Sequence, residues 1–463
     1  MRTNTGDGMK NTRCTRRVLM VAYHFAPEVT SATHRAIHFA RALHDEGFGV
    51  RVLAASLESL RLTDPSLNDV FPHPECIMRV GAARRIGDLY LSVKSRLSRS
   101  SREAAVEQEV AADGAGSASR GRRFAASVRA PFAAWDLFPD AQKAWFRPAL
   151  RASMGAGGDA DFDLVYASAP PWTALRVGHA IARRLKRPLV SAFRDPWTQV
   201  LGSSGRYRER VLERAARRWE RQIVNDSRLV ICNSPGLTGQ AREAYGGDRD
   251  EKFLTVLNGS AVPRRARSDS FPASQQLIIR HLGSLYAGRS VRPLLRALGD
   301  LVSRGDLSSQ DVRVELIGSR SEADALEGVA GGIEVVSESE VTFEAAVQRM
   351  QEPAVLLVVQ PPKMQHEIPT KLYDYLCTGN PVLVLASESS HTWAMAREFS
   401  RCQRLDWESP DENLQVLGGL LRTWKTGELR QERTQQDTAS LTKIAVCRQF
   451  VEAIRAALDM QPE

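Results

Sequence analysis

Short apolar runs alternate with amphipathic stretches along most of the chain. The run VLMVAYHF (18–25) is continuous, which is typical of a strand buried on both faces, and residues 33–46 then carry apolar side chains at helical spacing up to Gly47. VRVLAAS (50–56) supplies the next strand. A strand, a helix and a strand within about forty residues predict a parallel βαβ unit with a right-handed crossover.

The same alternation continues on both sides of AVPRRARSDSFPAS (261–274), a Pro-, Ser- and Arg-rich stretch without any period. We therefore predict an α/β protein with two doubly wound Rossmann-like domains that face each other across a cleft. The expected further strands are DLVYASAP (163–170), PLVSAF (188–193), RLVICNS (228–234), FLTVLNG (253–259), LIIRHLGS (277–284), VRVELIGS (312–319), IEVVS (333–337), AVLLVVQ (354–360) and VLVLAS (382–387), with helices at 173–186, 206–226, 291–304, 321–329 and 342–350 among them.

Composition sets the predicted domain boundaries. Residues 82–130 are rich in Arg, Ser, Ala and Gly and poor in aromatic and β-branched residues, which predicts a mobile insertion. Apolar side chains at helical spacing near the end of the chain predict a terminal amphipathic helix. The expected order is a disordered tail (1–16), a first domain (17–260), a linker (261–275), a second domain (276–430) and the C-terminal helix (431–463).

The overall composition fits a cytoplasmic protein. None of the apolar runs reaches the length of about 18 residues that a membrane span needs. The 6 cysteines are scattered without the spacing of a disulfide framework or a zinc site, so we expect no metal and no cofactor. The formal net charge of +9 indicates a polyanionic neighbour, and nucleic acid, anionic lipid and nucleotide phosphate all satisfy it.

In open parallel sheets, ligands bind beyond the carboxyl ends of the strands, where N–H groups at helix starts attract phosphates. The first such loop of the second domain is GSLYAGRS (283–290). Gly283, Ser284 and Gly288 allow the backbone to approach a ligand closely, and Arg289 stands just before the next helix. This loop is therefore a candidate site for an anion.

The second candidate loop leads into a helix and reads HEIPTKLYDYLCTGNPVLVL (366–385). Lys371 and Asp374 lie three residues apart, so they share one face of the first turn, and Gly379 is the expected helix stop. A cation at a helix N-terminus is unfavourable by about 0.3–1 kcal/mol at exposed sites, so Lys371 is misplaced unless an anion binds there. The alternative is an ion pair between Lys371 and Asp374 on the surface.

The first domain offers a corresponding loop after its first strand, HFAPEVTSATHR (24–35). Ser31, Thr33 and Arg35 can face a ligand across the cleft. His24 is either a functional side chain or a residue packed at the end of a strand.

A second loop of the first domain, RDPW (194–197), carries an Arg-Asp pair out of a buried strand. Asp195 is either a carboxylate that meets a hydroxylated substrate or half of a structural ion pair at a turn.

Together these loops resemble those of GT-B glycosyltransferases, and specifically of the family-4-like retaining enzymes of bacterial surface-polysaccharide assembly. The resemblance spans about residues 17–440. The stretches that carry it are VLMVAYHFAPE with THRAIHFARAL, DLVYASAPPW, SAFRDPW, DSRLVICNSPGL, VLNGS, HLGSLYAGR and IPTKLYDYLCTGNPVLVL, in this order.

The resemblance implies that a nucleotide-sugar donor binds mainly to the second domain, while a saccharide or lipid-linked saccharide acceptor approaches the first. Arg289 matches the family's basic residue after the glycine turn, and Lys371 takes a second such role, so both would neutralise the departing diphosphate. Asp374 stands where the family places the second acid of its paired-glutamate motif, which binds ribose hydroxyls.

Two positions depart from the family pattern. The first acid of the paired motif falls on His366, with Glu367 one residue off register, and both join the candidate donor site. The first-domain loop has Thr30, Ser31, Ala32 and Thr33 in place of paired glycines.

The implied activity is a hexosyl transfer with retention in cell-surface polysaccharide biosynthesis. Arg289, Lys371 and helix N–H groups would stabilise the leaving diphosphate in place of a metal, since no Asp-x-Asp sequence lies in the candidate loops. Asp195 or His24 would orient the acceptor.

Two alternatives to the transferase stay open at this point. The chain can be another enzyme of this architecture, such as a nucleotide-sugar epimerase, or a non-catalytic polyanion-binding protein. Nucleic acid is not the expected partner, because the arginines concentrate in the insertion and linker and not among aromatic residues.

A membrane contact is the remaining question for the stretch DLFPDAQKAWFRPAL (136–150). This stretch either rests on an anionic membrane, which would make the enzyme peripheral on the inner face of the plasma membrane, or belongs to the core.

Overall fold

The structure is a computed structural model, and it describes residues 16–60, 62–83, 138–155, 162–200, 207–247, 250–266, 269–271, 276–285, 288–319, 331–434 and 438–460. The predicted tail, most of the predicted insertion and the predicted helix at 321–329 lie outside these ranges. The chain divides into two compact units. The first comprises Met1–Ile231, Ala241–Leu254 and Val451–Glu463, and the second comprises Cys232–Gln240 and Thr255–Phe450.

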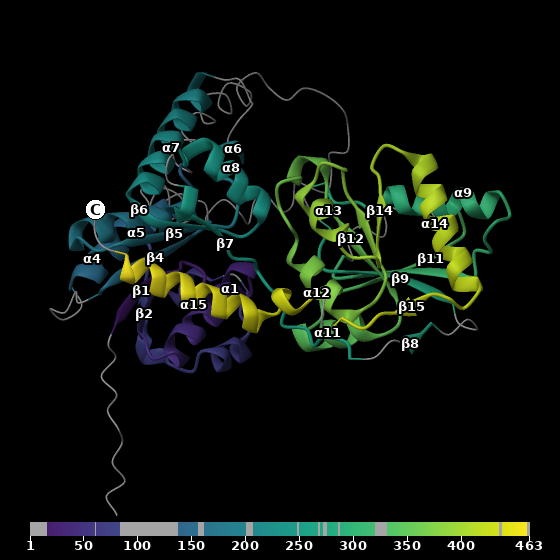
Figure 1. The fold of residues 1–463 in the computed structure, drawn as a ribbon, viewed down its shortest axis with the longest axis horizontal. Helices are drawn as coiled ribbons and strands as arrows, with labels where there is room; N and C mark the ends of the chain where they lie inside the picture. Colours follow the sequence, from purple (N-terminus) through teal and green to yellow (C-terminus); the bar gives the residue numbers. More distant parts are fainter. Residues whose placement is uncertain are drawn as a thin grey trace, which may run out of the picture. The chain divides into compact units, whose positions relative to one another are not determined.

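The first unit is built on a parallel sheet in which the first strand of the chain lies inside the sheet, with neighbours on both sides (Figure 1). Among the described residues the sheet has 7 strands in the order β3-β2-β1-β4-β5-β6-β7, and β1 pairs in parallel with both β2 and β4. The chain leaves β1 towards one side and returns on the other, so a topological switch point lies between β1 and β4. The strands are β1 (Arg17–Val21), β2 (Gly49–Ala55), β3 (Ile77–Val80), β4 (Leu164–Ala169), β5 (Leu189–Phe193), β6 (Ser227–Cys232) and β7 (Phe253–Thr255).

Helices connect these strands, as the hydrophobic spacing predicts. The first begins after Thr30, whose side chain accepts a hydrogen bond from the Thr33 N–H and caps the helix. Gly178 lets its helix pack directly on β4, because a Cβ at this position would lie 2.3 Å from the Cβ of Ala167. The helices are α1 (Ser31–Asp45), α4 (Phe146–Gly155), α5 (Trp172–Leu185), α6 (Trp197–Val200), α7 (Tyr207–Asp226) and α8 (Pro235–Tyr245).

The second unit repeats the same topology. Its described residues form a sheet of 6 strands in the order β11-β10-β9-β12-β13-β14, with β9 parallel to both β10 and β12. The switch point of this sheet therefore lies between β9 and β12. The strands are β9 (Leu277–Leu282), β10 (Val312–Ile317), β11 (Glu334–Glu338), β12 (Val355–Val359), β13 (Val382–Leu385) and β14 (Cys402–Leu405), and β8 (Asp269–Ser270) forms a separate antiparallel pair with β15 (Arg430–Gln431).

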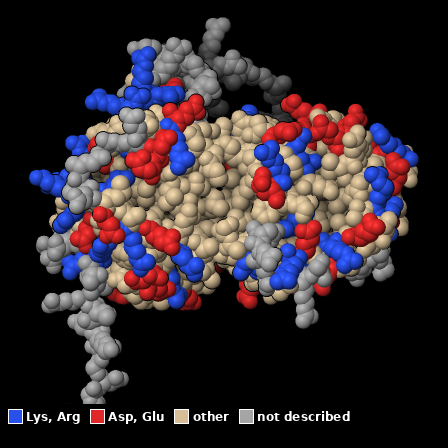
Figure 2. Space-filling model, in the orientation of Figure 1, with Lys and Arg blue, Asp and Glu red and all other residues tan. Residues whose placement is uncertain are grey.

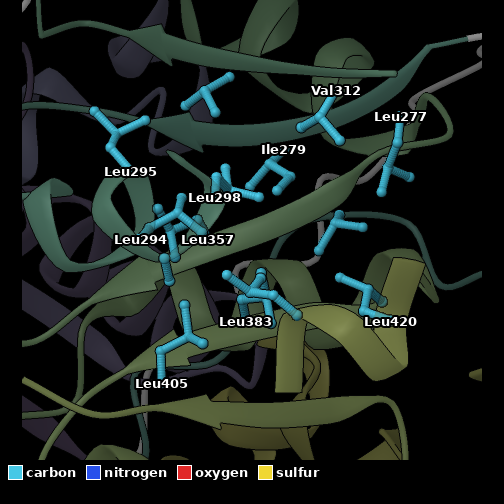
Figure 3. Packing of buried hydrophobic residues seen from close by; sticks show 14 of the residues in the cluster. Leu277, Ile279, Leu294, Leu295, Leu298, Val312, Leu357, Leu383, Leu405 and Leu420 are labelled. Carbon is cyan, nitrogen blue, oxygen red and sulfur yellow. The ribbon is translucent and has the colours of Figure 1, made fainter. Parts of the chain in front are cut away.

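Leucine side chains fill the core between this sheet and its helices. Figure 3 shows Leu294 and Leu298 of α9 beside Leu357 of β12, and all three are fully buried. Each buried leucine contributes about 1.5–3 kcal/mol relative to an exposed one, so this core holds the loops at the strand ends in place. The helices are α9 (Arg292–Ser303), α11 (Phe343–Gln351), α12 (Thr370–Thr378), α13 (His391–Ala396), α14 (Pro410–Lys425) and α15 (Lys443–Asp459), of which α15 ends in the first unit.

Part of the predicted linker is structured. Asp269–Ser270 pairs with β15 and Phe271 is buried in the core, so this part of the predicted linker belongs to the second unit.

Short 3-10 helices occupy several connections. The 3-10 helices are η1 (Leu57–Ser59), η2 (Pro65–Val70), η3 (Pro74–Cys76), η4 (Lys143–Trp145), η5 (Asp250–Lys252), η7 (Pro362–Met364) and η8 (Ala439–Leu441).

The surface carries charges of both signs. Figure 2 shows Lys and Arg interspersed with Asp and Glu on the face that it draws. Trp145, one of the aromatic residues for which a membrane contact was an alternative, is fully buried and belongs to the core. Across the described ranges, no helix is long and apolar enough to span a membrane.

Candidate functional site

The two candidate loops of the second unit leave neighbouring strands at the switch point. The loop with Gly283 follows β9, and the loop with His366 follows β12 and leads into α12. Because β9 and β12 are parallel neighbours, both loops emerge from the same edge of the sheet. The sequence therefore brings its two anion-site candidates to one place.

The side chain of Lys371 lies over this edge. Its Nζ is 3.4 Å from Nε2 of His281, a buried residue of β9. His281 Nδ1 lies 2.8 Å from the carbonyl oxygen of Leu357, so Nδ1 carries the proton and Nε2 is free to accept a hydrogen bond from the lysine. Burial, with Lys371 next in importance, lowers the pKa of His281 to about 3, so this imidazole is neutral.

Arg289 adds a second cation to the same place. Its side chain is 9% exposed, and its charge acts on both Lys371 and His281. Burial, followed by Arg289, lowers the pKa of Lys371 to about 8, while Asp374 raises it. We call Lys371, His281, Arg289 and Gly283 the Lys371 cluster. Two neighbouring cations beside the start of α12, with no acidic residue in the first turn of that helix, form an arrangement suited to an anion.

Glycine makes room for the lysine. Gly283 has a φ of +101°, and a Cβ at this position would lie 2.4 Å from Lys371 Nζ. Gly318, at the end of the neighbouring strand β10, has a φ of +83°, and a Cβ there would lie 3.1 Å from the Gly283 Cα. Ser319 Oγ donates a hydrogen bond to the Gly283 carbonyl oxygen at 2.7 Å and fixes the loop. Both positions favour glycine, because the backbone has a positive φ there and a Cβ would lie too close to neighbouring atoms.

Asp374 does not form the surface ion pair that was the alternative for Lys371. The helix α12 is almost completely buried, and the Asp374 side chain accepts a hydrogen bond of 2.7 Å from Ser260 Oγ. Burial raises the pKa of Asp374 to about 6, against the opposing effects of Ser260, Lys443 and Lys371. The helix ends at Gly379 with a φ of +77°, as predicted.

We expect Ser260→Ala to lower the free energy of unfolding by about 1–3 kcal/mol at pH 8, because a buried carboxylate loses its hydrogen-bond donor. The native pKa of Asp374 lies above its unfolded value, so the carboxyl is protonated in the folded state below pH 6 and the cost of the lost donor falls there. Chemical denaturation at pH 5 and pH 8 measures the difference. In an Asp374→Asn background the pH dependence of the Ser260→Ala effect should vanish, and its persistence would show that another group causes it.

The remaining donor-site candidates lie around the same strand ends. Ser284 Oγ donates to Glu340 Oε1 at 3.4 Å. His366 Nδ1 accepts a hydrogen bond of 2.8 Å from the Gln240 side chain, and its ring stands edge-on to His391. The Glu367 carbonyl oxygen accepts from Thr392 Oγ1, which ties this loop to α13. Gly288 has a φ of +86° and open space around it.

In the first unit, the predicted loop after β1 is an ordered structure. His24 Nδ1 lies 2.6 Å from the Glu28 carboxylate, which is buried. Ser31 is exposed, whereas Thr33 is fully buried and shares the capping contacts of Thr30. Arg35 is 3% exposed and lies over the ring of Phe39 at 4.6 Å.

The RDPW loop is held by its arginine. Arg194 Nε donates to the Ala169 carbonyl oxygen at 3.1 Å, and Nη2 donates to that of Pro170. Burial lowers the pKa of Arg194 to about 10, so the side chain stays charged at neutral pH. Burial also raises the pKa of the half-buried Asp195, and the neighbouring Arg194 opposes this shift. Arg194 therefore ties the end of β5 to the end of β4 and presents Asp195 beside them.

Sequence reasoning missed His281, Gly318 and Ser260. His281 and Ser260 lie inside apolar or short connecting stretches, where one polar residue gives no signal of its own. Gly318 did have a signal in the sequence, because β9 and β10 are each followed by a Gly-Ser pair, 283–284 and 318–319.

Over the described ranges, no group of three or more His, Cys, Asp or Glu side chains is arranged to hold a metal ion.

Comparison with known proteins agrees with this architecture. Residues 95–259 match the family model for Glycosyltransferase Family 4. A search of curated proteins finds no match. The chain is similar to the structure of HepE from Anabaena in complex with UDP, with a TM-score of 0.57, 13% identity, and coverage of 95% of this chain and 100% of that one.

Two further solved structures share the fold. Sucrose-phosphate synthase from Thermosynechococcus elongatus has a TM-score of 0.61 at 11% identity, over 95% of this chain and 98% of that one. A protein from Listeria monocytogenes that is assigned as a UDP-N-acetylglucosamine 2-epimerase has a TM-score of 0.51 at 9% identity, over 96% of this chain and 97% of that one. The family match over residues 95–259 and the shared fold agree with the resemblance that the motifs predicted: the chain has the GT-B fold, and part of it is similar to Glycosyltransferase Family 4.

Proposed function

We propose that the protein transfers a hexosyl group from a nucleotide-sugar donor to a saccharide or lipid-linked saccharide acceptor. The observation that supports this most directly is the Lys371 cluster, two cations beside a glycine at the switch point of the second sheet. A diphosphate fits this place because its negative charge complements the two neighbouring cations. The complex of HepE with UDP supports a nucleoside diphosphate as the ligand.

In this proposal the protein acts mainly on the leaving group. The bond between the sugar C1 and the diphosphate oxygen breaks, and negative charge accumulates on the phosphates while positive charge grows on the ring. Lys371, Arg289 and the N–H groups at the start of α12 stabilise that diphosphate. The acceptor hydroxyl forms the new bond to C1 from the same face and passes its proton to the departing diphosphate oxygen, so the configuration is retained. Asp374 would bind ribose hydroxyls, and Asp195 or His24 would orient the acceptor.

The wider setting belongs to the same proposal. We place the reaction in cell-surface polysaccharide biosynthesis, on the cytoplasmic side of the membrane, where a lipid-linked acceptor would require peripheral association. No metal takes part, because the two cations supply the positive charge that a metal would otherwise bring to the diphosphate.

A second candidate is a nucleotide-sugar epimerase. The structural similarity to the epimerase of Listeria monocytogenes favours it, since that protein shares the fold over nearly the whole chain. The two candidates differ in what they need, because an epimerase converts its nucleotide sugar without any acceptor.

A thermal-shift screen against UDP-, GDP-, dTDP- and CMP-sugars tests donor binding. A ligand present at 100 times its Kd stabilises a protein by about 2.7 kcal/mol, which raises the melting temperature measurably. We expect one nucleotide series to stabilise the wild type and not Arg289→Ala. Stabilisation by nucleic acid or anionic vesicles, with none by any nucleotide sugar, would contradict the proposal.

The affinity for the nucleoside diphosphate should fall as the pH rises above 8. The pKa of Lys371 is about 8, and only its charged form attracts the phosphates, so the fraction of binding-competent protein decreases through this pH. The limiting slope is about tenfold in Kd per pH unit if only the charged form binds. Titration calorimetry between pH 7 and pH 9.5 measures it. In Lys371→Arg the slope should flatten, since arginine stays charged, and an unchanged slope would assign the effect to another group.

A further inference from the structure

Two tryptophans stack face to face in the first unit. The rings of Trp172 and Trp197 have centroids 5.0 Å apart and planes only 3° from parallel. Trp197 is fully buried, whereas Trp172 is partly exposed. One face of the Trp172 ring is thus covered by Trp197, while the residue as a whole stays partly exposed.

Contacts from both sides hold this pair in position. Trp172 begins α5, and the next residue, Thr173, binds Asp140 through its N–H and its hydroxyl, each at 2.7 Å. Trp197 is followed by Thr198, which hydrogen-bonds the buried carboxyl of Glu220. Arg194 adds its hydrogen bonds to the carbonyl oxygens of the loop before Trp172. A ring fixed in this way loses little entropy when it binds a ligand.

The pair also lies where this fold binds ligands. Trp172 follows β4, which flanks the switch point of the first sheet together with β1. Asp195 follows the neighbouring strand β5 and is two residues from Trp197. The first unit therefore has an aromatic ring and a carboxylate at the same edge of its sheet, and the cation beside them, Arg194, donates to the carbonyl oxygens of Ala169 and Pro170.

An aromatic ring with a neighbouring carboxylate suits a sugar ring. The C–H bonds on one side of a pyranose form an apolar patch with slightly positive hydrogens, which the negative face of an indole attracts. A carboxylate accepts hydrogen bonds from the hydroxyls at the rim. Neither group suits a phosphate, because both would repel its charge.

We propose that Trp172 is the platform on which the acceptor stacks a pyranose ring, with Asp195 accepting hydrogen bonds from its hydroxyls. This inference rests on the proposed function and adds which residues bind the sugar of the acceptor. Trp172 is then a residue that determines acceptor specificity, and the donor site does not depend on it.

Saturation-transfer NMR with simple glycosides tests the platform. The probes are the methyl pyranosides of glucose, galactose, mannose and N-acetylglucosamine, with the acyclic polyol mannitol as a probe that has hydroxyls but no ring. We expect at least one glycoside to receive saturation on the C–H protons of one ring face. The signal should remain in Trp172→Phe and fall at least fivefold in Trp172→Leu, while mannitol gives none.

The same samples separate the two proposals. Stabilisation by the nucleotide sugar should be equal in the wild type and both Trp172 variants, which also shows that they are folded. Loss of glycoside binding alone supports the platform. Glycoside binding that survives in Trp172→Leu, or no glycoside binding while the nucleotide sugar still binds, would overturn the platform and leave the tryptophans as core residues. Failure of nucleotide-sugar binding in the wild type would instead contradict the transferase itself.

Discussion

Lys371→Met is expected to weaken binding of the nucleoside diphosphate by about 100-fold, since a charge-assisted hydrogen bond contributes about 1.5–3 kcal/mol and each 1.4 kcal/mol is tenfold in affinity. The ligand-free protein should become more stable by on the order of 1 kcal/mol at pH 7. The reason is that burial and Arg289 both oppose the charge of Lys371, so the folded state carries a cost that Asp374 offsets only in part and that a bound anion would offset further. Methionine keeps most of the side-chain volume and removes that cost.

Calorimetry and thermal unfolding of the same samples measure both effects. Lys363→Met is the matched control, because Lys363 is an exposed lysine of η7 in the loop before α12. It should change neither the affinity nor the melting temperature. Opposite signs of the two effects identify a binding residue, because a lysine that served only the fold would lower stability when removed. Lys371→Met with unchanged affinity would remove the cluster from the site.

Gly283→Ala should weaken binding of the nucleoside diphosphate by up to about 100-fold, as in Lys371→Met, and also destabilise the protein by about 1–3 kcal/mol. The φ of +101° strains any residue with a Cβ, and the new methyl group would lie 2.4 Å from Lys371 Nζ and 2.6 Å from its Cε. The lysine must therefore leave its position beside His281. The loss of binding comes from that displacement and the loss of stability mostly from the backbone.

Gly427→Ala separates these two causes. Gly427 lies in the same unit with a φ of +70°, and a Cβ there would meet no atom within 4 Å. It should lose stability to a similar degree and keep its affinity for the nucleoside diphosphate. Equal affinities of the two alanine variants would mean that the position of Lys371 does not matter for the ligand.

The sequence predicted the sheets well because their pattern is local. Continuous apolar runs such as 18–25 and 354–360 mark strands buried on both faces, and in the structure the first overlaps β1 and the second contains β12. The end of α12 at Gly379 could also be predicted, because a helix that ends in a left-handed residue favours glycine at that position. These features need only neighbours along the chain.

The contacts that the site residues make could not be predicted from the sequence. His281 lies 90 residues before Lys371, and Ser260 lies 114 residues before Asp374, so no local pattern links them. The alternative of a surface ion pair between Lys371 and Asp374 was wrong, because each side chain contacts a partner from a distant segment of the chain. The stack of Trp172 on Trp197 likewise depends on the pairing of β4 with β5.

The rate of nucleoside diphosphate release from a nucleotide sugar, with and without saccharide acceptors, tests the central claim most directly. A coupled assay with each donor and the methyl glycosides should show release that depends on the acceptor, at least 100-fold slower in Lys371→Met than in the wild type. No acceptor-dependent release from any pair, or conversion of the nucleotide sugar without an acceptor, would contradict the transferase account and favour the epimerase.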